Sequence, residues 1–427
     1  MIARFAPVLA LLLCARPAAA QTPTPAPAAT AAPLPAPATR DDAPPATPVA
    51  TAVETPIPVP TATATPSATG DSAAKSAALG KSELGEGRRL PIGGYGEVHF
   101  TQVNGKSGGG ELDLRRFILF VGHRFDEKLA FYSEVEISHS SLETEVEQAY
   151  LEYTLHPALG FRAGSILVPM GIINQFHEPP TFHGVQRPEV DDVIIPTTWR
   201  EAGIAAFGEP VEGLRYQVQL VDGLNAAGFS GSMGLREGRQ EAVEAKANDF
   251  GYVVRLDYSP ILGLELGATG YSGKAGQQQP TLEHTGVNMV EADLRANWKG
   301  LWLRGEFAHA RIEDAKTLDA LIVADPIGGA VEGWYGEAAY DVLRLVRARV
   351  PSVRAELWPF ARLERTNTQL AMPQGFVANQ AYDRIYKTVG VSLKPIPQIA
   401  VKVDYQWINA RSGPLPQRWH LGIGYMF

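Results

Sequence analysis

The chain has few cysteines and no long apolar run after its first twenty residues. Cys14 is its only cysteine, and it lies in an N-terminal stretch that we expect to be removed, so the mature chain cannot form disulfides. No later stretch approaches the roughly 20 consecutive apolar residues that a membrane-spanning helix needs. If the chain crosses a membrane, it must do so as a closed barrel, because lipid leaves open backbone groups unsatisfied.

An excess of basic charge is also missing. The formal net charge is −8 over 427 residues, and acids and bases are mixed throughout. Bulk charge therefore argues against a nucleic-acid partner. The net charge bears on the solubility of the protein and on the electric field around it more than on any particular ligand.

Residues 1–20 have the layout of a secretory signal peptide. Arg4 gives a short positive start, an apolar run follows, and Ala18, Ala19 and Ala20 offer small residues for cleavage before Gln21. A lipid-modified Cys14 is the alternative that we weigh. Leu13 precedes this cysteine where a lipoprotein signal would need a small residue, so we favour cleavage after Ala20.

Residues 21–90 are predicted to be a disordered linker rich in Pro, Ala and Thr, which an exported barrel would hold in the periplasm. Positions 21–70 contain 13 Pro, 14 Ala and 11 Thr, a composition that cannot bury a core. We interpret the segment as an extended spacer. The more specific alternative is a tether that contacts the cell wall.

From Pro91 to Phe427 polar and apolar residues alternate with a period of two. Runs of roughly 9 to 13 residues fit tilted membrane strands. Short turns alternate along the chain with longer polar loops, as in outer-membrane barrels. We therefore predict an all-β fold, a transmembrane antiparallel β-barrel of about 16 strands over residues 91–427. The strands are expected to begin near 91, 111, 127, 144, 159, 199, 213, 249, 262, 285, 300, 330, 352, 381, 397 and 417.

The last residues, Trp419 to Phe427, form an amphipathic run that ends in an aromatic residue. This run looks like the final strand of outer-membrane proteins. The resemblance implies that Phe427 is an assembly signal for the barrel-assembly machinery. It also implies outer-membrane lipid as the surroundings of the barrel.

The segment from Val168 to Gly208 is similar to a stretch of the phosphate-selective porin O/P family. The similarity rests on Pro169-Met-Gly171, His177-Glu-Pro-Pro180, Arg187-Pro188, Ile195-Pro196 and Trp199-Arg-Glu-Ala-Gly203, together with Arg115-Arg116 and Phe360-Ala-Arg-Leu-Glu364. It covers about residues 91–427. The resemblance implies a sixteen-stranded porin in the cell outer membrane, usually a homotrimer, whose third outer loop folds inward and narrows the pore.

Charged residues of this third outer loop are the candidates for the pore constriction, because selectivity needs placed charges at a narrow point. They are His177, Glu178, His183, Arg187, Glu189, Asp191 and Asp192. Alternation predicts further bases facing the lumen, namely Arg215, Arg255, Arg295, Arg304, Arg354, Arg362, Lys387 and Lys402. Acids at least match these bases in number. We therefore favour pairing across strands over a dedicated anion ladder, and phosphate selectivity stays open.

We expect no metal site, no cofactor and no catalytic site. His177 and His183 are six residues apart with two prolines between them, which excludes a helical HExxH site. His139 lies among serines in a predicted outer loop, and the sequence assigns it no orienting partner.

The function expected from these patterns is passive diffusion of small hydrophilic solutes or ions through a porin, with anions such as phosphate among them. A plugged structural or adhesive outer-membrane barrel that does not conduct is the alternative. A soluble secreted β-protein is a third interpretation.

Overall fold

The computed structural model describes residues 92–427, except 107 and 140–143. The predicted signal peptide, the linker and the barrel boundary at Pro91 lie outside the described residues. So does Cys14.

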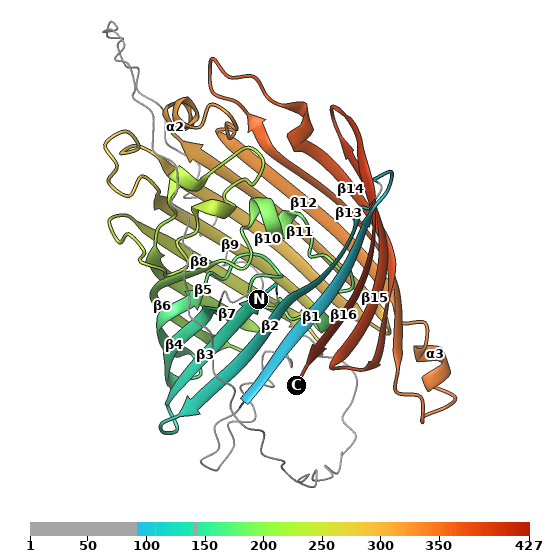
Figure 1. Cartoon of the computed structure of the whole chain (residues 1–427). Coiled ribbons are helices and arrows are strands. Elements are labelled where there is room, and N and C mark those ends of the chain that lie inside the picture. The colour runs from blue at the N-terminus through green and yellow to red at the C-terminus, as the bar shows by residue number, and fades with distance from the viewer. Residues whose placement is uncertain (1–91, 107, 140–143) are drawn as a thin grey trace, which may run out of the picture. The chain divides into compact units, whose positions relative to one another are not determined.

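Sixteen antiparallel strands close into a barrel within the described ranges (Figure 1). Each strand pairs with its sequence neighbours, and β1 pairs with β16 in a register that includes Tyr95 opposite Met426. The strands are β1 (Ile92–Val103), β2 (Gly110–Arg124), β3 (Leu129–Ser138), β4 (Thr144–His156), β5 (Leu159–Leu167), β6 (Arg200–Val211), β7 (Leu214–Asp222), β8 (Phe250–Ile261), β9 (Leu264–Lys274), β10 (Gly286–Trp298), β11 (Leu301–Glu313), β12 (Ala330–Tyr340), β13 (Glu356–Ala371), β14 (Asp383–Ile396), β15 (Ile399–Ala410) and β16 (Gly413–Met426).

The predicted all-β barrel is thus confirmed, with strand starts close to those expected. Two starts differ most. β13 begins at Glu356 rather than near 352, because the preceding connection contains the helix α3 (Arg344–Arg347) and an irregular stretch after it. β16 begins at Gly413 rather than near 417, because only Arg411 and Ser412 separate it from β15.

Side chains alternate between two faces of the barrel wall, as β8 illustrates. Val253 and Arg255 are buried, whereas Tyr252, Val254 and Leu256 between and around them are about half exposed on the outer face. A membrane strand needs this pattern of apolar residues outward and polar residues inward. The wall therefore has an apolar outer band and a lumen lined with charged and amide groups.

The connections form two sets at opposite ends of the barrel. The end that carries the C-terminus has short turns such as 157–158 and 262–263, with α3 as its longest connection (Figure 1). The other end has longer loops, including one with helix α2 (Ala315–Leu321). The third and fourth of these loops are L3, residues 168–199, and L4, residues 223–249.

No helix in the described part of the chain combines the length and the apolar character needed to cross a membrane.

Candidate functional site

L3 folds into the barrel, and its backbone amides are held by acids of the far wall. The N–H of Ile172 donates to Glu306 of β11 at 3.1 Å. The N–H of Val185 donates to Asp404 of β15 at 2.7 Å. Because β11 and β15 lie across the barrel from β5 and β6, which flank L3 in sequence, the loop crosses the lumen.

Bases of the same wall bind the carbonyl oxygens of L3. Lys402 Nζ donates to Gly184 O at 2.8 Å, and Arg304 Nη2 donates to Thr181 O at 3.0 Å. Arg362 reaches Gln186 O at 3.4 Å through Nη1. These three predicted lumen bases do face inward, but their side chains bind carbonyl oxygens of L3.

Close packing fixes the path of L3 at two glycines. Gly171 has φ +78°, and a Cβ there would lie 2.7 Å from Glu306 Oε1. At Gly424 of β16 a Cβ would lie 2.3 Å from Cβ of Pro179 in L3. L3 therefore fits against the wall only because these positions lack side chains.

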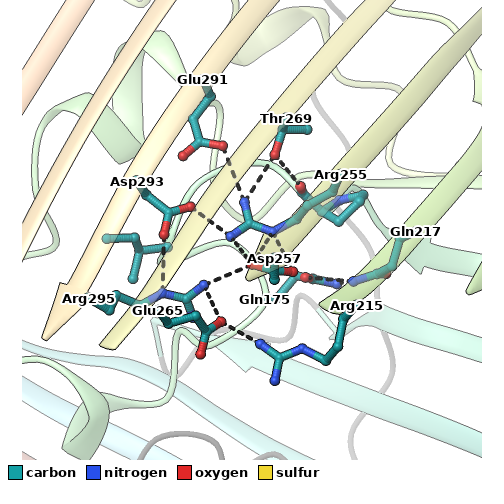
Figure 2. A network of polar contacts seen from close by, with 12 residues as sticks. Gln175, Arg215, Gln217, Arg255, Asp257, Glu265, Thr269, Glu291, Asp293 and Arg295 are labelled. Atoms are coloured by element: carbon teal, nitrogen blue, oxygen red, sulfur yellow. Dashed lines mark hydrogen bonds and ion pairs between the residues drawn. The ribbon is translucent and has the colours of Figure 1, made fainter. Parts of the chain in front are cut away.

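Three other predicted lumen bases form an ion-pair network on β7–β10 (Figure 2). Arg255 is nearly fully buried and contacts Asp257 at 2.7 Å, Asp293 at 2.7 Å and Glu291 at 3.2 Å. The network continues through Arg295 and Glu265 to Arg215. Thr269 links it to L3, because this hydroxyl accepts from Arg255 Nη1 at 3.0 Å and donates to Pro169 O at 3.0 Å. These arginines pair with acids on their own or neighbouring strands, in agreement with the interpretation that we favoured.

Two of the predicted lumen bases lie elsewhere, and these predictions are wrong. Lys387 is exposed on the outer face of β14, opposite the exposed Leu363, because its neighbours Tyr386 and Thr388 face inward. Arg354 precedes β13 in the connection that contains α3, so no strand directs it into the lumen.

Three of the seven predicted constriction residues, His177, His183 and Asp191, are buried between L3 and the wall, and the other four are partly exposed. His183 packs against Trp302, Trp358 and Phe360, with ring centroids 4.4 to 6.1 Å apart. Burial, together with the positive charge of Lys394, holds the pKa of His183 well below its usual range, which favours the neutral imidazole.

Two acids of L3 show the cost of this burial. Asp191 is fully buried, and neither carboxylate oxygen has a hydrogen-bond partner among the described residues. Burial and the nearby Glu291 raise the pKa of Asp191 well above its ordinary value. Burial also raises the pKa of Glu189 to about 7, with Asp192 and Glu364 adding to the shift. Asp191 therefore does not line an open pore.

His177 and Glu178 lie on the opposite side of L3, near β3 and β4. His177 Nε2 is 2.8 Å from Glu147 Oε1 of β4. Burial alone would lower the pKa of His177, but the carboxylate of Glu147 raises it. Burial likewise raises the pKa of Glu178. Among the described residues, Glu134 of β3, Glu147 and His177 form a group whose ligand atoms lie close enough together to hold a metal ion.

An arginine-rich pocket of about 300 Å³ lies between L3, L4 and the wall of β2–β6; we call it the basic pocket. Its lining includes six arginines and four glutamates, with His139, Ser138 and Thr198. The charged members are Arg115, Arg116, Arg187, Arg200, Arg236, Arg239, Glu136, Glu145, Glu237 and Glu241.

Most arginines of the basic pocket have acidic partners. Arg116 contacts Glu97 at 2.7 Å, and Arg200 contacts Glu145 at 2.6 Å. Arg236 pairs with Asp192. The positive charge of each of these three arginines is therefore compensated by an acidic partner.

Arg187 differs from the other arginines of the basic pocket. Its Nη1 donates to Thr198 Oγ1 at 3.2 Å, and its Nε and Nη2 are buried without a hydrogen-bond partner among the described residues. Burial and the nearby Arg116 lower its pKa to about 10. A buried guanidinium with free donors beside a second arginine is suited to binding an anion.

Sequence reasoning found Arg187 but missed the contribution of L4. Arg236 and Arg239 donate to the carbonyls of Thr197 at 2.6 Å and Thr198 at 2.8 Å, which joins L4 to the end of L3. Their spacing in a polar loop gave no sign of this contact. Arg115-Arg116 and Arg200 fell within the motifs of the family resemblance.

His139, for which the sequence gave no orienting partner, has one in the structure. Its Nδ1 is 2.8 Å from Asp113 Oδ2 at the outer rim. Ser138 donates to Glu136 at 2.9 Å instead of approaching the imidazole. Ser140 and Ser141 lie outside the described residues.

Comparison with known proteins gives one close relative in sequence and several in fold. No family model matches the chain, so the resemblance to the phosphate-selective porin O/P family stays a prediction. The chain is 32% identical over 334 residues to an uncharacterized protein of Aquifex aeolicus, covering 74% of this chain and 75% of that protein.

Two solved structures illustrate the shared fold. The anion-selective porin from Comamonas acidovorans matches with a TM-score of 0.51 at 12% identity, over 80% of this chain and 100% of that one. The outer-membrane protein OmpT of Vibrio cholerae, in a trimer form, matches with a TM-score of 0.51 at 9% identity, over 80% and 100%. At such identities the likeness shows the fold alone.

Proposed function

We propose that this chain, which belongs to the same family as the Aquifex aeolicus protein and has the barrel fold of the porins, is an outer-membrane porin for small hydrophilic anions. The observation that carries the proposal is Arg187, which lines the basic pocket beside L3 and whose Nε and Nη2 have no hydrogen-bond partner among the described residues. An arriving anion would accept these hydrogen bonds and relieve the repulsion between Arg187 and Arg116.

The solute class follows from the chemistry of the pocket. Arg187 forms no ion pair with an acid among the described residues, unlike the other five arginines of the basic pocket, and guanidinium groups bind phosphate and carboxylate oxygens well. Phosphate is the natural probe, because the family resemblance points to it. Transport is passive and involves no chemical step.

The surroundings that we propose are the outer membrane, with the N-terminal segment in the periplasm. The apolar outer band of strands such as β8 supports a lipid environment. We also propose a homotrimer, by analogy with the trimer form of the Vibrio cholerae protein. The aromatic Phe427, which stacks on Phe117 with ring centroids 6.3 Å apart, would be the signal read by the barrel-assembly machinery.

The test is the ion selectivity of the refolded protein in a planar bilayer. In a potassium chloride gradient we expect a reversal potential of an anion-selective pore, and phosphate should reduce the chloride current. Arg187→Ala should move the reversal potential toward that of a cation-selective pore and weaken the phosphate effect. Arg411→Ala is the matched control, because Arg411 lies in an exposed outer turn and should leave both values unchanged.

A plugged barrel is the second candidate, and the packing of L3 with L4 favours it. Apolar residues of both loops, including Val193, Phe229 and Leu235, belong to one buried cluster with wall residues. A folded protein that gives no discrete current steps would support this candidate and contradict the porin proposal. Steps with unchanged selectivity in Arg187→Ala would instead contradict the role of Arg187.

A further inference from the structure

The imidazole of His177 is oriented by a hydrogen bond to the backbone of its own loop. Its Nδ1 lies 3.0 Å from the carbonyl oxygen of Asn174. Because a carbonyl can only accept, Nδ1 carries the proton and donates it. In a neutral ring Nε2 then carries the lone pair, which is the state of a metal-binding histidine whose other nitrogen donates to a carbonyl, whereas in a protonated ring Nε2 carries a proton toward Glu147.

The lone-pair nitrogen faces a carboxylate that has no other partner for the same oxygen. His177 Nε2 and Glu147 Oε1 are 2.8 Å apart, and neither atom has a further partner among the described residues. Both residues are at least nine-tenths buried. A lone pair and a carboxylate oxygen at this distance repel each other unless a cation or a proton lies between them.

A second carboxylate completes a three-ligand set. Glu134 of β3 offers an oxygen, and the three ligand atoms of Glu134, Glu147 and His177 lie within 4.8 Å of one another. The hydroxyl of Tyr95 donates to the other oxygen of Glu147, Oε2, at 3.4 Å. This contact orients the carboxylate of Glu147 and leaves Oε1 available for an ion.

We propose that Glu134, Glu147 and His177 bind one divalent transition-metal ion such as Zn²⁺, which ties L3 to the wall of β3 and β4. Two carboxylates and a neutral imidazole carry two negative charges, which match the ion, and one nitrogen with two oxygens is an accepted zinc donor set. The proposal is independent of the solute that passes the pore.

The position of the site gives the ion a structural role. On β3 Glu134 precedes Glu136 by two residues, and on β4 Glu147 follows Glu145 by two residues; Glu136 and Glu145 line the basic pocket. The far wall holds L3 through hydrogen bonds with its backbone, whereas this near wall meets it through His177. A bound ion would therefore fix the side of L3 that borders the basic pocket.

The spacing of the ligands explains why sequence reasoning did not find the site. His183, the histidine nearest to His177 in sequence, packs among aromatic rings on the other side of L3. The carboxylates come instead from two strands more than 25 residues earlier. Only the inward folding of L3 brings the three side chains together.

The experiment is zinc binding to the refolded full chain after treatment with a chelator. We expect about one zinc per chain by elemental analysis, and a Co²⁺ complex with visible absorption. Glu147→Gln and His177→Ala should weaken zinc binding at least 100-fold, and Tyr95→Phe about 10-fold. His284→Ala is the matched control, because His284 is exposed in another outer loop and should bind like the parent chain.

A second measurement keeps the proposal testable if the variants fold poorly. X-ray absorption of the zinc-loaded parent chain should show one imidazole nitrogen and oxygen ligands at about 2.0 Å. A chelator-treated parent chain that binds no zinc would overturn the proposal and leave a proton between His177 and Glu147. Zinc binding that persists in folded His177→Ala would overturn it as well.

Discussion

The backbone N–H of Glu189 donates a 2.6 Å hydrogen bond to Oε2 of Glu364, although both residues are acids. The contact attaches L3 to β13 through the main chain. Glu364 also accepts from Arg362 Nε at 2.7 Å, so one carboxylate joins the loop and a wall base. The attachment thus depends on Glu364 and very little on the side chain of Glu189.

Removal of this acceptor should loosen L3. In Glu364→Ala the amide of Glu189 and the guanidinium of Arg362 lose their partner, so we expect larger fluctuations in the open-channel current. Glu364→Gln keeps an acceptor oxygen for the amide and is the matched control. Single-channel recordings that are equally quiet for both variants would contradict the assigned role of Glu364.

The buried network should contribute to stability through Arg255 far more than through Arg215. Arg255→Met leaves Asp257, Asp293 and Glu291 without their main partner, and breaking such a buried set costs about 3–5 kcal/mol in the free energy of unfolding. Arg215→Met changes a base that is 43% exposed, so the loss should stay below ~1 kcal/mol. Urea unfolding in detergent or lipid vesicles would measure the loss of unfolding free energy in both variants. Equal losses would contradict the larger contribution that we assign to Arg255.

Docking of L3 should weaken as the pH rises. The folded-state pKa of Asp191 lies well above the ordinary value of 3.8, because burial and Glu291 disfavour the charged form. The protonated carboxyl therefore stabilises the folded loop fully below about pH 4, and this contribution is lost as the pH rises toward the folded pKa.

Hydrogen exchange of L3 peptides, corrected for intrinsic rates, would measure this pH dependence. Protection should fall between acidic and neutral pH in the parent chain. Asp191→Asn cannot ionise and should show much less dependence on pH. Identical pH profiles for the two proteins would show that Asp191 is not the responsible group.

The sequence was a good guide to the wall because strand alternation is a local property. Val253 and Arg255 face inward, and Val254 faces outward, as their spacing predicts. At Lys387 the same reasoning fails, because Tyr386 and Thr388 occupy the inward positions and the lysine is exposed on the outer face.

The site was harder to predict because alternation says which way a side chain points but not what it meets. Arg304 and Lys402 face inward as expected, yet each binds a carbonyl of L3. The approach of L4 to L3 through Arg236 depends on two loops far apart in sequence. These contacts arise from tertiary folding, and no period or motif records them.

The way in which the far wall holds L3 separates the position of the loop from its composition. Glu306, Asp404 and Glu364 bind main-chain amides, and Lys402 and Arg304 bind main-chain carbonyls, groups that nearly every amino acid supplies. Exchanging those side chains of L3 that are only partly buried would leave these main-chain contacts in place. A few substitutions among these residues could therefore change which solutes pass, by evolution or by design, while the barrel and the position of L3 stay the same.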